Sequence, residues 1–293
     1  MNAPVECEGA PRDLGRDQGL VCAASLREGF AAEPFGLRLA LRLGRASRRA
    51  SALCRELRRH FPRQAETLAG LAAASGVPPA WLAELQLREA RPGEAALAAA
   101  ASGELVRTGA VLGRELPGHW IVRRSRPEGG FRCLELTRPW LAHALLGVNE
   151  AGLAAAVSCG APGPGGEAEQ RASTASARLP AAPLATDCLQ RFATLGACLE
   201  WCSARPGDGP ATLLFADASG EIAGIELAPG RRRVLRCAEG WLAVGGSREL
   251  REALAKSLRE GAVIDPALAW ANPTARTLRL GSELGSGDVG LEV

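Results

Sequence analysis

Lysine and tyrosine are almost missing from this sequence. All but one of the 35 basic residues are arginine, the exception being Lys256, and tyrosine does not occur. We interpret this as a compositional bias of the genome, because either basic residue serves on an ordinary protein surface. The net charge of +3 is small, and by itself it predicts neither a nucleic-acid nor a membrane partner.

The usual signatures of membrane, secreted and zinc-binding proteins are also lacking. No apolar run reaches the roughly 18 residues that a spanning helix needs, and the opening MNAPVECEG has no apolar signal-peptide stretch. The nine cysteines form no Cys-x-x-Cys pair, and the three histidines lie far from any pair of cysteines. We therefore expect no metal and no cofactor, and unpaired thiols favour a cytoplasmic location.

What the sequence does have is enough apolar material, 47% of its residues, for a large core. Its first 92 residues read as a helical segment. Apolar residues recur every three or four positions over residues 39–61 and mark one helix face, whereas arginines occupy most of the rest. Further helices are expected over residues 63–75 and 80–88, on either side of the break at residues 76–79.

From Gly93 onward the pattern changes to short strands, then two helices, then further strands. Turns are expected at residues 107–109, 128–130 and 217–221, and residues 160–178, rich in Gly and Pro, read as a long loop. The expected strands are residues 95–101, 104–106, 110–114, 120–124, 131–136, 152–158, 212–216, 221–227, 233–237, 241–244 and 276–280. The expected helices are residues 184–193, 196–204 and 247–260. This order predicts one α+β domain over residues 1–293 with antiparallel sheets.

Five segments, spread over nearly the whole chain, occur in an order and spacing that we identify as a family pattern. They are GAPRDLGRDQG at 9–19, HFPRQAETLAGLAAASGVPPAWLAELQLRE at 60–89, GR at 113–114, GVNEAGL at 147–153 and LLFADASGEIAGIE at 213–226. Together they resemble the isopenicillin-N acyltransferase-like family of N-terminal-nucleophile (Ntn) hydrolases. The resemblance implies a four-layer αββα sandwich of two antiparallel sheets over residues 93–293, preceded by the helical segment 1–92.

The resemblance also implies a chemistry. In that family a precursor cleaves itself before a cysteine, which then attacks an amide or thioester and forms an acyl-enzyme. Here Glu94 stands where the family has that cysteine, and a carboxylate cannot perform an N-to-S acyl shift. Cys159 stands where relatives carry an oxyanion-stabilising asparagine, and its S–H group is a weak donor.

The sequence therefore predicts a divergent acyltransferase-like or amidohydrolase-like protein without an intact catalytic centre, a pseudoenzyme. Its old cleft, lined by Arg114, Asn149 and Arg248, is expected to bind a small acidic, acyl or amide molecule. Arg114 would face either Glu94 or the carboxylate of that molecule, because a guanidinium presents donors suited to a carboxylate.

Two other functional interpretations stay open. The first is an active acyltransferase or C–N amide hydrolase with a displaced nucleophile, Cys159 or Cys133. Ser102 is the nearest hydroxyl to Glu94, but it lies too close to the expected turn at 107–109 to begin the first strand. The second is an interaction module that acts through the basic face of the helix at residues 39–61. We expect no nucleic-acid and no membrane partner, and the sequence predicts no oligomeric state.

Overall fold

The structure of the chain is a computed structural model. It describes residues 4–45, 47–89, 96–100, 104–110, 120–159, 181–207, 211–228, 230–237, 240–245, 252, 256, 275–282 and 289–292. The predictions that concern Glu94, Ser102, Arg114 and Arg248 lie outside these residues, as does the expected loop at 160–178.

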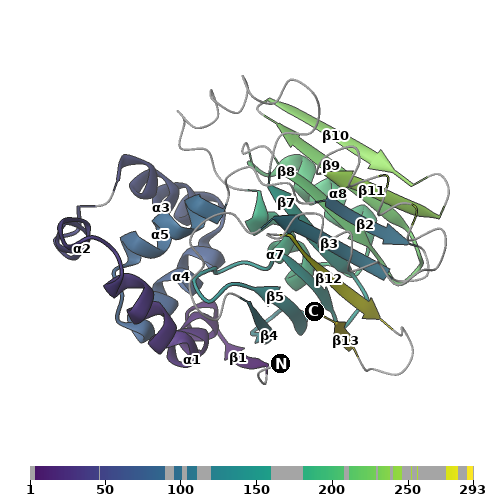
Figure 1. The fold of residues 1–293 in the computed structure, drawn as a ribbon. Coiled ribbons are helices and arrows are strands. Elements are labelled where there is room, and N and C mark those ends of the chain that lie inside the picture. Colours follow the sequence, from purple (N-terminus) through teal and green to yellow (C-terminus); the bar gives the residue numbers. More distant parts are fainter. Residues whose placement is uncertain are drawn as a thin grey trace.

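The described strands form two sheets (Figure 1). The eight-stranded sheet has the order β1-β4-β5-β6-β7-β8-β9-β10, in which β1 and β4 are parallel and all other neighbours antiparallel. Its strands are β1 Val5–Gly9, β4 Ile121–Pro127, β5 Cys133–Thr137, β6 Leu146–Asn149, β7 Ala154–Cys159, β8 Ala211–Ala216, β9 Ile222–Ala228 and β10 Arg231–Arg236. The five-stranded sheet has the order β11-β2-β3-β12-β13. Its strands are β11 Trp241–Gly245, β2 Ala96–Ala100, β3 Glu104–Ala110, β12 Ala275–Ser282 and β13 Val289–Glu292.

The middle of the large sheet is buried on both faces. In β7, Ala155 and Val157 belong to the core beneath the helices, whereas Ala154 and Ala156 belong to a second core. That second core also holds Val244 of β11, and β2 and β3 lie close to β7 and β8, so the two sheets are stacked. Because successive side chains of a strand point to opposite faces, burial of both faces explains why β7 and β8 are mostly apolar and do not alternate with polar residues.

Helices α1, α7 and α8 lie against the large sheet, α3, α4 and α5 pack against one another and α4 against α1, and Figure 1 shows α1–α5 gathered at one side of the molecule. The helices are α1 Pro11–Ala31, α2 Phe35–Arg42, α3 Arg48–His60, α4 Pro62–Ser75, α5 Pro79–Glu89, α7 Ala182–Arg191 and α8 Leu195–Ala204. A helix over residues 247–260 would supply the outer layer on the small sheet, but only Glu252 and Lys256 of that range are described. The molecule is thus a mixed α/β protein with two stacked sheets, and the four-layer arrangement stays a prediction.

Helices α1 and α4 pack closely because glycines line their contact. A Cβ atom on Gly15 would lie 1.8 Å from the carbonyl oxygen of Thr67, and one on Gly70 would lie 2.0 Å from that of Arg12. No other residue permits such an approach between helix backbones. The G-x-x-x-G pattern at residues 15–19 of the family-like segment therefore serves helix packing.

Several predicted elements are confirmed with small shifts of their ends. The helices expected at 63–75, 80–88, 184–193 and 196–204 correspond to α4, α5, α7 and α8. The turns at 128–130 and 217–221 join β4 to β5 and β8 to β9. Gly76 ends α4 in the left-handed conformation, with φ of 73°, which is the usual role of a glycine after a helix.

The single helix expected over residues 39–61 is wrong. The chain leaves α2 at Gly44, whose φ of 72° a helix cannot accommodate, and Ser47 begins α3 by accepting a hydrogen bond from the Ala50 N–H at 3.1 Å. The apolar spacing predicts that Leu39 and Leu43 face inward, but both are exposed. Only the α3 half of the pattern, including Leu53 and Leu57, packs into the core.

Three strand predictions are also corrected. The helical reading of the first 92 residues missed β1, where Val5 and Cys7 point inward and the two glutamates between and after them point out. It is a short period-2 pattern of five residues. The turn expected at 107–109 lies inside β3, which pairs Thr108 with Ala96 of β2. Strand β6 was missed because all four of its residues are buried, which leaves no alternation to detect.

A buried ion pair joins α1 to the large sheet. Arg123 of β4 donates from Nε to the Glu135 carboxylate of β5 at 2.8 Å, and both side chains are almost fully buried. Arg123 Nη1 also donates to Gln18 Oε1 at 2.7 Å. The Gln18 amide in turn donates to the carbonyl oxygens of Pro139 and Leu141, each at 3.0 Å. The network therefore fixes one helix, two strands and the loop after β5 relative to one another.

We expect Arg123→Met to lower the free energy of unfolding by about 3–5 kcal/mol, because it leaves the Glu135 carboxylate buried without its cation. Urea denaturation followed by circular dichroism measures the change. Arg124→Met is the matched control: its guanidinium pairs with Glu6 at 2.7 Å on the exposed face of the same strand, so its loss should stay below about 1 kcal/mol. Equal losses in the two variants would contradict the importance of the buried pair.

Candidate functional site

Three strand ends meet at one end of the five-stranded sheet. Ala96, the first residue of β2, lies between Thr108 of β3 and Gly245, the last residue of β11. The chain reaches Ala96 from Glu94, two positions earlier, and leaves Gly245 toward Arg248, three positions later. It leaves β3 at Ala110, on the same end of the sheet as the start of β2. Segments that are far apart in the sequence therefore enter or leave the small sheet at the same end.

Two predicted site positions fall within the described chain. Cys159 is the last residue of β7, and its backbone is paired with Ala211 of β8; its side chain lies outside what the structure describes. Asn149 is the last residue of β6 and is 5% exposed.

The Asn149 side chain holds a turn together. Its Nδ2 donates to the carbonyl oxygens of Leu189 and Phe192, both at 2.8 Å, at the end of α7. Its Oδ1 accepts from the N–H groups of Ala151 and Leu153, both at 3.0 Å, in the β6–β7 turn. These four bonds use the full capacity of the amide, so this side chain has no donor or acceptor left for a ligand. The GVNEAGL segment is thus a structural joint between the sheet and α7.

Asp217 has a similar structural role in the turn between β8 and β9. Its carboxylate accepts from the N–H of Leu195, the first residue of α8, at 2.9 Å, and from Ser219 N at 3.0 Å. Partial burial raises the pKa of Asp217, but the hydrogen bonds from Ser219 and Leu195 outweigh it and lower the pKa overall. An ionised carboxylate at a helix N-terminus is stabilising, and it fixes α8 on the sheet.

Cys133, Cys7 and Cys22 are buried thiols and not reactive thiolates. Cys133 is 2% exposed and its thiol lies 3.6 Å from the carbonyl oxygen of Leu189. Burial raises the pKa of Cys133 well above its usual value, with a further contribution from Glu135. Burial likewise raises the pKa of Cys7 to about 12 and that of Cys22 to about 11. A nucleophilic cysteine requires an electropositive, accessible site, so Cys133 is a structural residue and not a displaced nucleophile.

Histidine and metal chemistry is not supported by the described part of the chain. Burial lowers the pKa of His143 to about 3, so this imidazole is neutral at physiological pH. His60 lies 3.3 Å from Glu56 on the surface of α3. Within the described ranges, no group of three or more His, Cys, Asp or Glu side chains could hold a metal ion.

Asp187 is a buried ionisable residue that sequence reasoning missed. It lies in α7, 3% exposed, with its carboxylate 3.9 Å from Arg191 Nε. Burial raises the pKa of Asp187 to about 6, although Arg191 and two further arginines pull the pKa down. The helical period that predicted α7 gives no sign that this acid faces inward, because it is surrounded in sequence by residues of mixed type.

The fold is that of a mixed α/β protein with two stacked sheets, and comparisons with known proteins extend this description only in part. No family model matches the chain, and no curated protein matches its sequence. None of the helices in the described chain is both long enough and apolar enough to cross a membrane.

Similar structures do exist among solved proteins. An orthologue of N-acylethanolamine-hydrolyzing acid amidase from Caenorhabditis elegans is 13% identical with a TM-score of 0.46, over 66% of this chain and 94% of that one. Penicillin V acylase from Agrobacterium tumefaciens is 18% identical with a TM-score of 0.30, over 58% of this chain and 50% of that one. A variant of conjugated bile acid hydrolase from Clostridium perfringens is 13% identical with a TM-score of 0.31, over 57% of each. At these scores the likeness is partial and is no basis for assigning an activity.

We expect Asn149→Ala to destabilise the protein by about 2–4 kcal/mol, since it removes four hydrogen bonds and leaves buried backbone groups unpaired. Thermal unfolding gives the size of the loss. The neighbouring Glu150→Ala removes only exposed contacts with Arg132, the ion pair and a hydrogen bond from the Arg132 N–H, and its cost should be below about 1 kcal/mol. An Asn149→Ala protein as stable as the wild type would show that this amide does not hold the turn.

The raised pKa of Asp187 predicts a pH-dependent gain in stability for Asp187→Asn. The stability that protonation of Asp187 contributes is fully present below the unfolded pKa of 3.8 and is lost as pH rises through about 6. At pH 7.5 the neutral variant should therefore be more stable than the wild type, by an amount on the order of 2 kcal/mol. Near pH 3.5 the two should unfold alike. Asp13→Asn, at an exposed acid paired with Arg16, is the control, and a gain for Asp187→Asn that did not change with pH would rule out this origin.

Proposed function

We propose that this chain is a divergent acyltransferase-like or amidohydrolase-like protein of the Ntn type that has lost its nucleophile and keeps a small-molecule cleft. The observation that carries the proposal is the meeting of strand ends at Ala96, Ala110 and Gly245. Glu94, Arg114 and Arg248 follow or precede these ends by two to four positions in the sequence. A site built from residues next to one end of a sheet is what the family resemblance requires.

The roles of the family-like motifs support the same proposal. In the described chain, Gly15 and Gly70 allow close helix packing, Asn149 holds the β6–β7 turn, and Asp217 fixes α8. Each of these contacts serves the scaffold and needs no catalytic residue. The sequence keeps the motifs that stabilise the fold and departs from the family where a thiol is needed, at Glu94.

The cleft would bind a small molecule with a carboxylate, or an acyl or amide compound that carries negative charge. Arg114 and Arg248 are the cations next to the strand ends in sequence, and a guanidinium pairs with a carboxylate through two parallel hydrogen bonds. With Glu94 in place of the thiol, Arg114 would bind either this glutamate or the ligand. No cofactor is required for this binding.

The alternative is an active acyltransferase or C–N amide hydrolase in which Cys159 supplies the nucleophile. Cys133 is not a candidate nucleophile for this alternative, because its thiol is buried and protonated. An interaction module acting through a basic helix is confined to the outer face of α3, since Ala50, Leu53 and Leu57 are buried.

The absence of a nucleophile at Glu94 predicts that the protein is not self-processed. Denaturing electrophoresis and intact mass of freshly purified protein should show one chain of 30.5 kDa. A cut between Gly93 and Glu94 would instead give two fragments, because family members release a new N-terminus at this position.

Two variants make the result specific. Fragments that persist unchanged in Glu94→Ala and Cys159→Ala would come from another protease in the preparation. Fragments that disappear in Cys159→Ala would assign self-cleavage to this thiol, and the pseudoenzyme proposal would then give way to the displaced-nucleophile alternative.

A further inference from the structure

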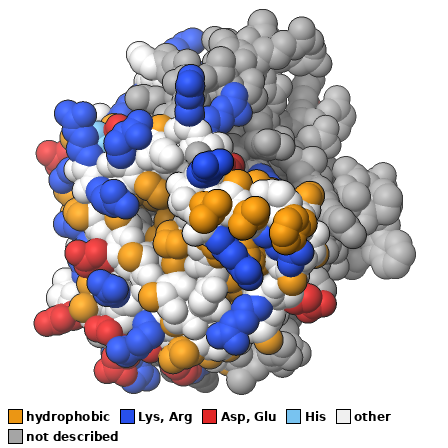
Figure 2. All heavy atoms as spheres, turned by 90° about the vertical axis from the view of Figure 1, so that its left-hand side faces the viewer, with side chains coloured by type: hydrophobic (Ala, Val, Ile, Leu, Met, Phe, Trp, Pro, Cys, Tyr) orange, Lys and Arg blue, Asp and Glu red, His pale blue; other side chains and the backbone are white. Residues whose placement is uncertain are grey.

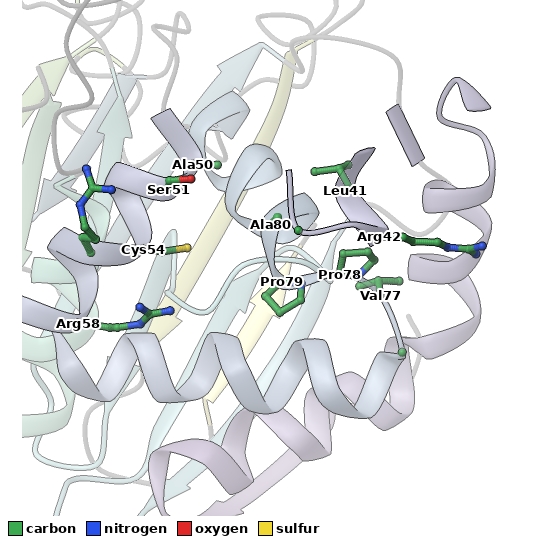
Figure 3. A pocket seen from close by; sticks show the side chains of 13 residues that line it. Leu41, Arg42, Ala50, Ser51, Cys54, Arg58, Val77, Pro78, Pro79 and Ala80 are labelled. Carbon is green, nitrogen blue, oxygen red and sulfur yellow. The ribbon is translucent and has the colours of Figure 1, made fainter. Parts of the chain in front are cut away.

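A second pocket lies entirely within the helical part of the molecule. It has a volume of about 710 Å³ and opens between α2, α3 and the turn that joins α4 to α5 (Figure 3). This volume is within the range of small-molecule sites, roughly 300–1,000 Å³. No strand among the described residues contributes to it, so it is separate from the cleft proposed above and does not depend on that proposal.

One wall of the pocket is aliphatic. Leu41 of α2 and Val77 of the α4–α5 turn are buried, and Pro78, Pro79 and Ala80 continue the same surface. None of the described residues that line the pocket is aromatic. A nucleobase or other flat ring would therefore have no stacking partner, whereas an aliphatic chain would bury apolar area against these side chains.

The opposite wall is cationic. Arg55 and Arg58 are exposed residues one turn apart on α3, and no carboxylate among the described residues forms an ion pair with either. Glu56, the acid between them in sequence, lies beside His60 instead. Two like charges three positions apart on a helix repel each other. An anion between them would relieve this repulsion.

The space between the two walls contains no ionised thiol. Figure 3 shows Cys54 and Arg58 directed from α3 toward the wall formed by Val77–Ala80. Burial raises the pKa of Cys54, although Arg58 pulls it down, so this thiol is a neutral part of the lining. Arg42, at the far end, lies over the ring of Phe30 at 5.6 Å, which leaves Arg55 and Arg58 as the cations for a bound anion.

We propose that this pocket binds an aliphatic carboxylate, with its carboxylate between Arg55 and Arg58 and its chain against Leu41, Val77 and Pro78. The arginine-rich face formed by α1–α5 (Figure 2) attracts such anions from solution. The two walls of the pocket then select a ligand that is both charged and aliphatic, because neither wall alone contacts both parts.

Isothermal titration calorimetry of the full chain with decanoate, below its micellar concentration, tests the proposal. Binding should be saturable with one site per chain. Acetate offers the charge without the chain, and decanol the chain without the charge, so each should bind at least about 10-fold more weakly. The decanoate affinity should also fall with added salt, since the arginines are exposed.

Variants assign the site. Arg55→Ala and Arg58→Ala should each weaken decanoate binding by about 3- to 10-fold, and the double variant more than either. Arg59→Ala, an exposed arginine on the same helix that does not line the pocket, should change the affinity by less than about 2-fold. Ser51→Phe places a large side chain in the pocket from α3 and should abolish binding. The arginine variants change exposed residues only, so they should keep the fold intact.

Three results would overturn the proposal. One is the absence of saturable decanoate binding, and another is equal binding of decanol and decanoate. The third is an affinity that the Arg55→Ala, Arg58→Ala double variant leaves unchanged. If Arg114→Ala removes decanoate binding and the double variant does not, the ligand occupies the cleft of the proposed function instead. Failure of decanoate to bind the helical pocket would therefore not contradict the proposed cleft. The cleft is tested separately, by the self-processing experiment and by Arg114→Ala.

Discussion

The buried pair of Arg123 and Glu135 is the constraint on which the arrangement of helices and sheet depends. Two charges removed from water are costly unless each is paired and hydrogen-bonded. Arg123 therefore needs both Glu135 and Gln18, and Gln18 needs the carbonyl groups of the loop after β5. In the observed position of α1, Gln18 reaches both the Arg123 guanidinium and these carbonyl groups. The pair thus selects one placement of the helix on the sheet, which apolar contact alone would leave less specific.

Placement of α1 in turn places the rest of the helical part. Because α4 approaches α1 through Gly15 and Gly70 with no room for a side chain, its position follows from that of α1. Helices α3 and α5 then pack beside α4, and the turn at Gly76 brings Val77 and the following prolines opposite α3. The pocket with Arg55 and Arg58 follows from these contacts, because α3 forms one of its walls and the α4–α5 turn forms the other.

The two proposed ligand sites use the molecule differently. The cleft of the proposed function belongs to strand ends of the small sheet, where the family resemblance places its chemistry. The helical pocket belongs to elements that have no part in that chemistry, and it depends on an aliphatic wall and on two arginines that form no ion pair with a described carboxylate. Both sites favour carboxylates for the same reason: nearly every cation in this chain is a guanidinium, which forms paired hydrogen bonds with such groups.

The spacing of apolar residues and the positions of turn residues in the sequence predict most of the described elements. Regular apolar spacing gave α4, α5, α7 and α8, and the Asp-Ala-Ser-Gly turn gave the β8–β9 hairpin, because these signals depend on local geometry. That residue 94 is a glutamate is likewise a fact of sequence, since no fold can turn a carboxylate into a thiol; its place at the family's nucleophile position stays a prediction. Tertiary structure decided what local patterns cannot express. It broke the long amphipathic pattern at Gly44, paired β1 with β4 across more than a hundred residues, and buried Asp187 and the Arg123 network. It also turned Asn149 into a structural joint by bringing the end of α7 to it. These outcomes depend on which distant groups meet, and only the folded chain brings them together.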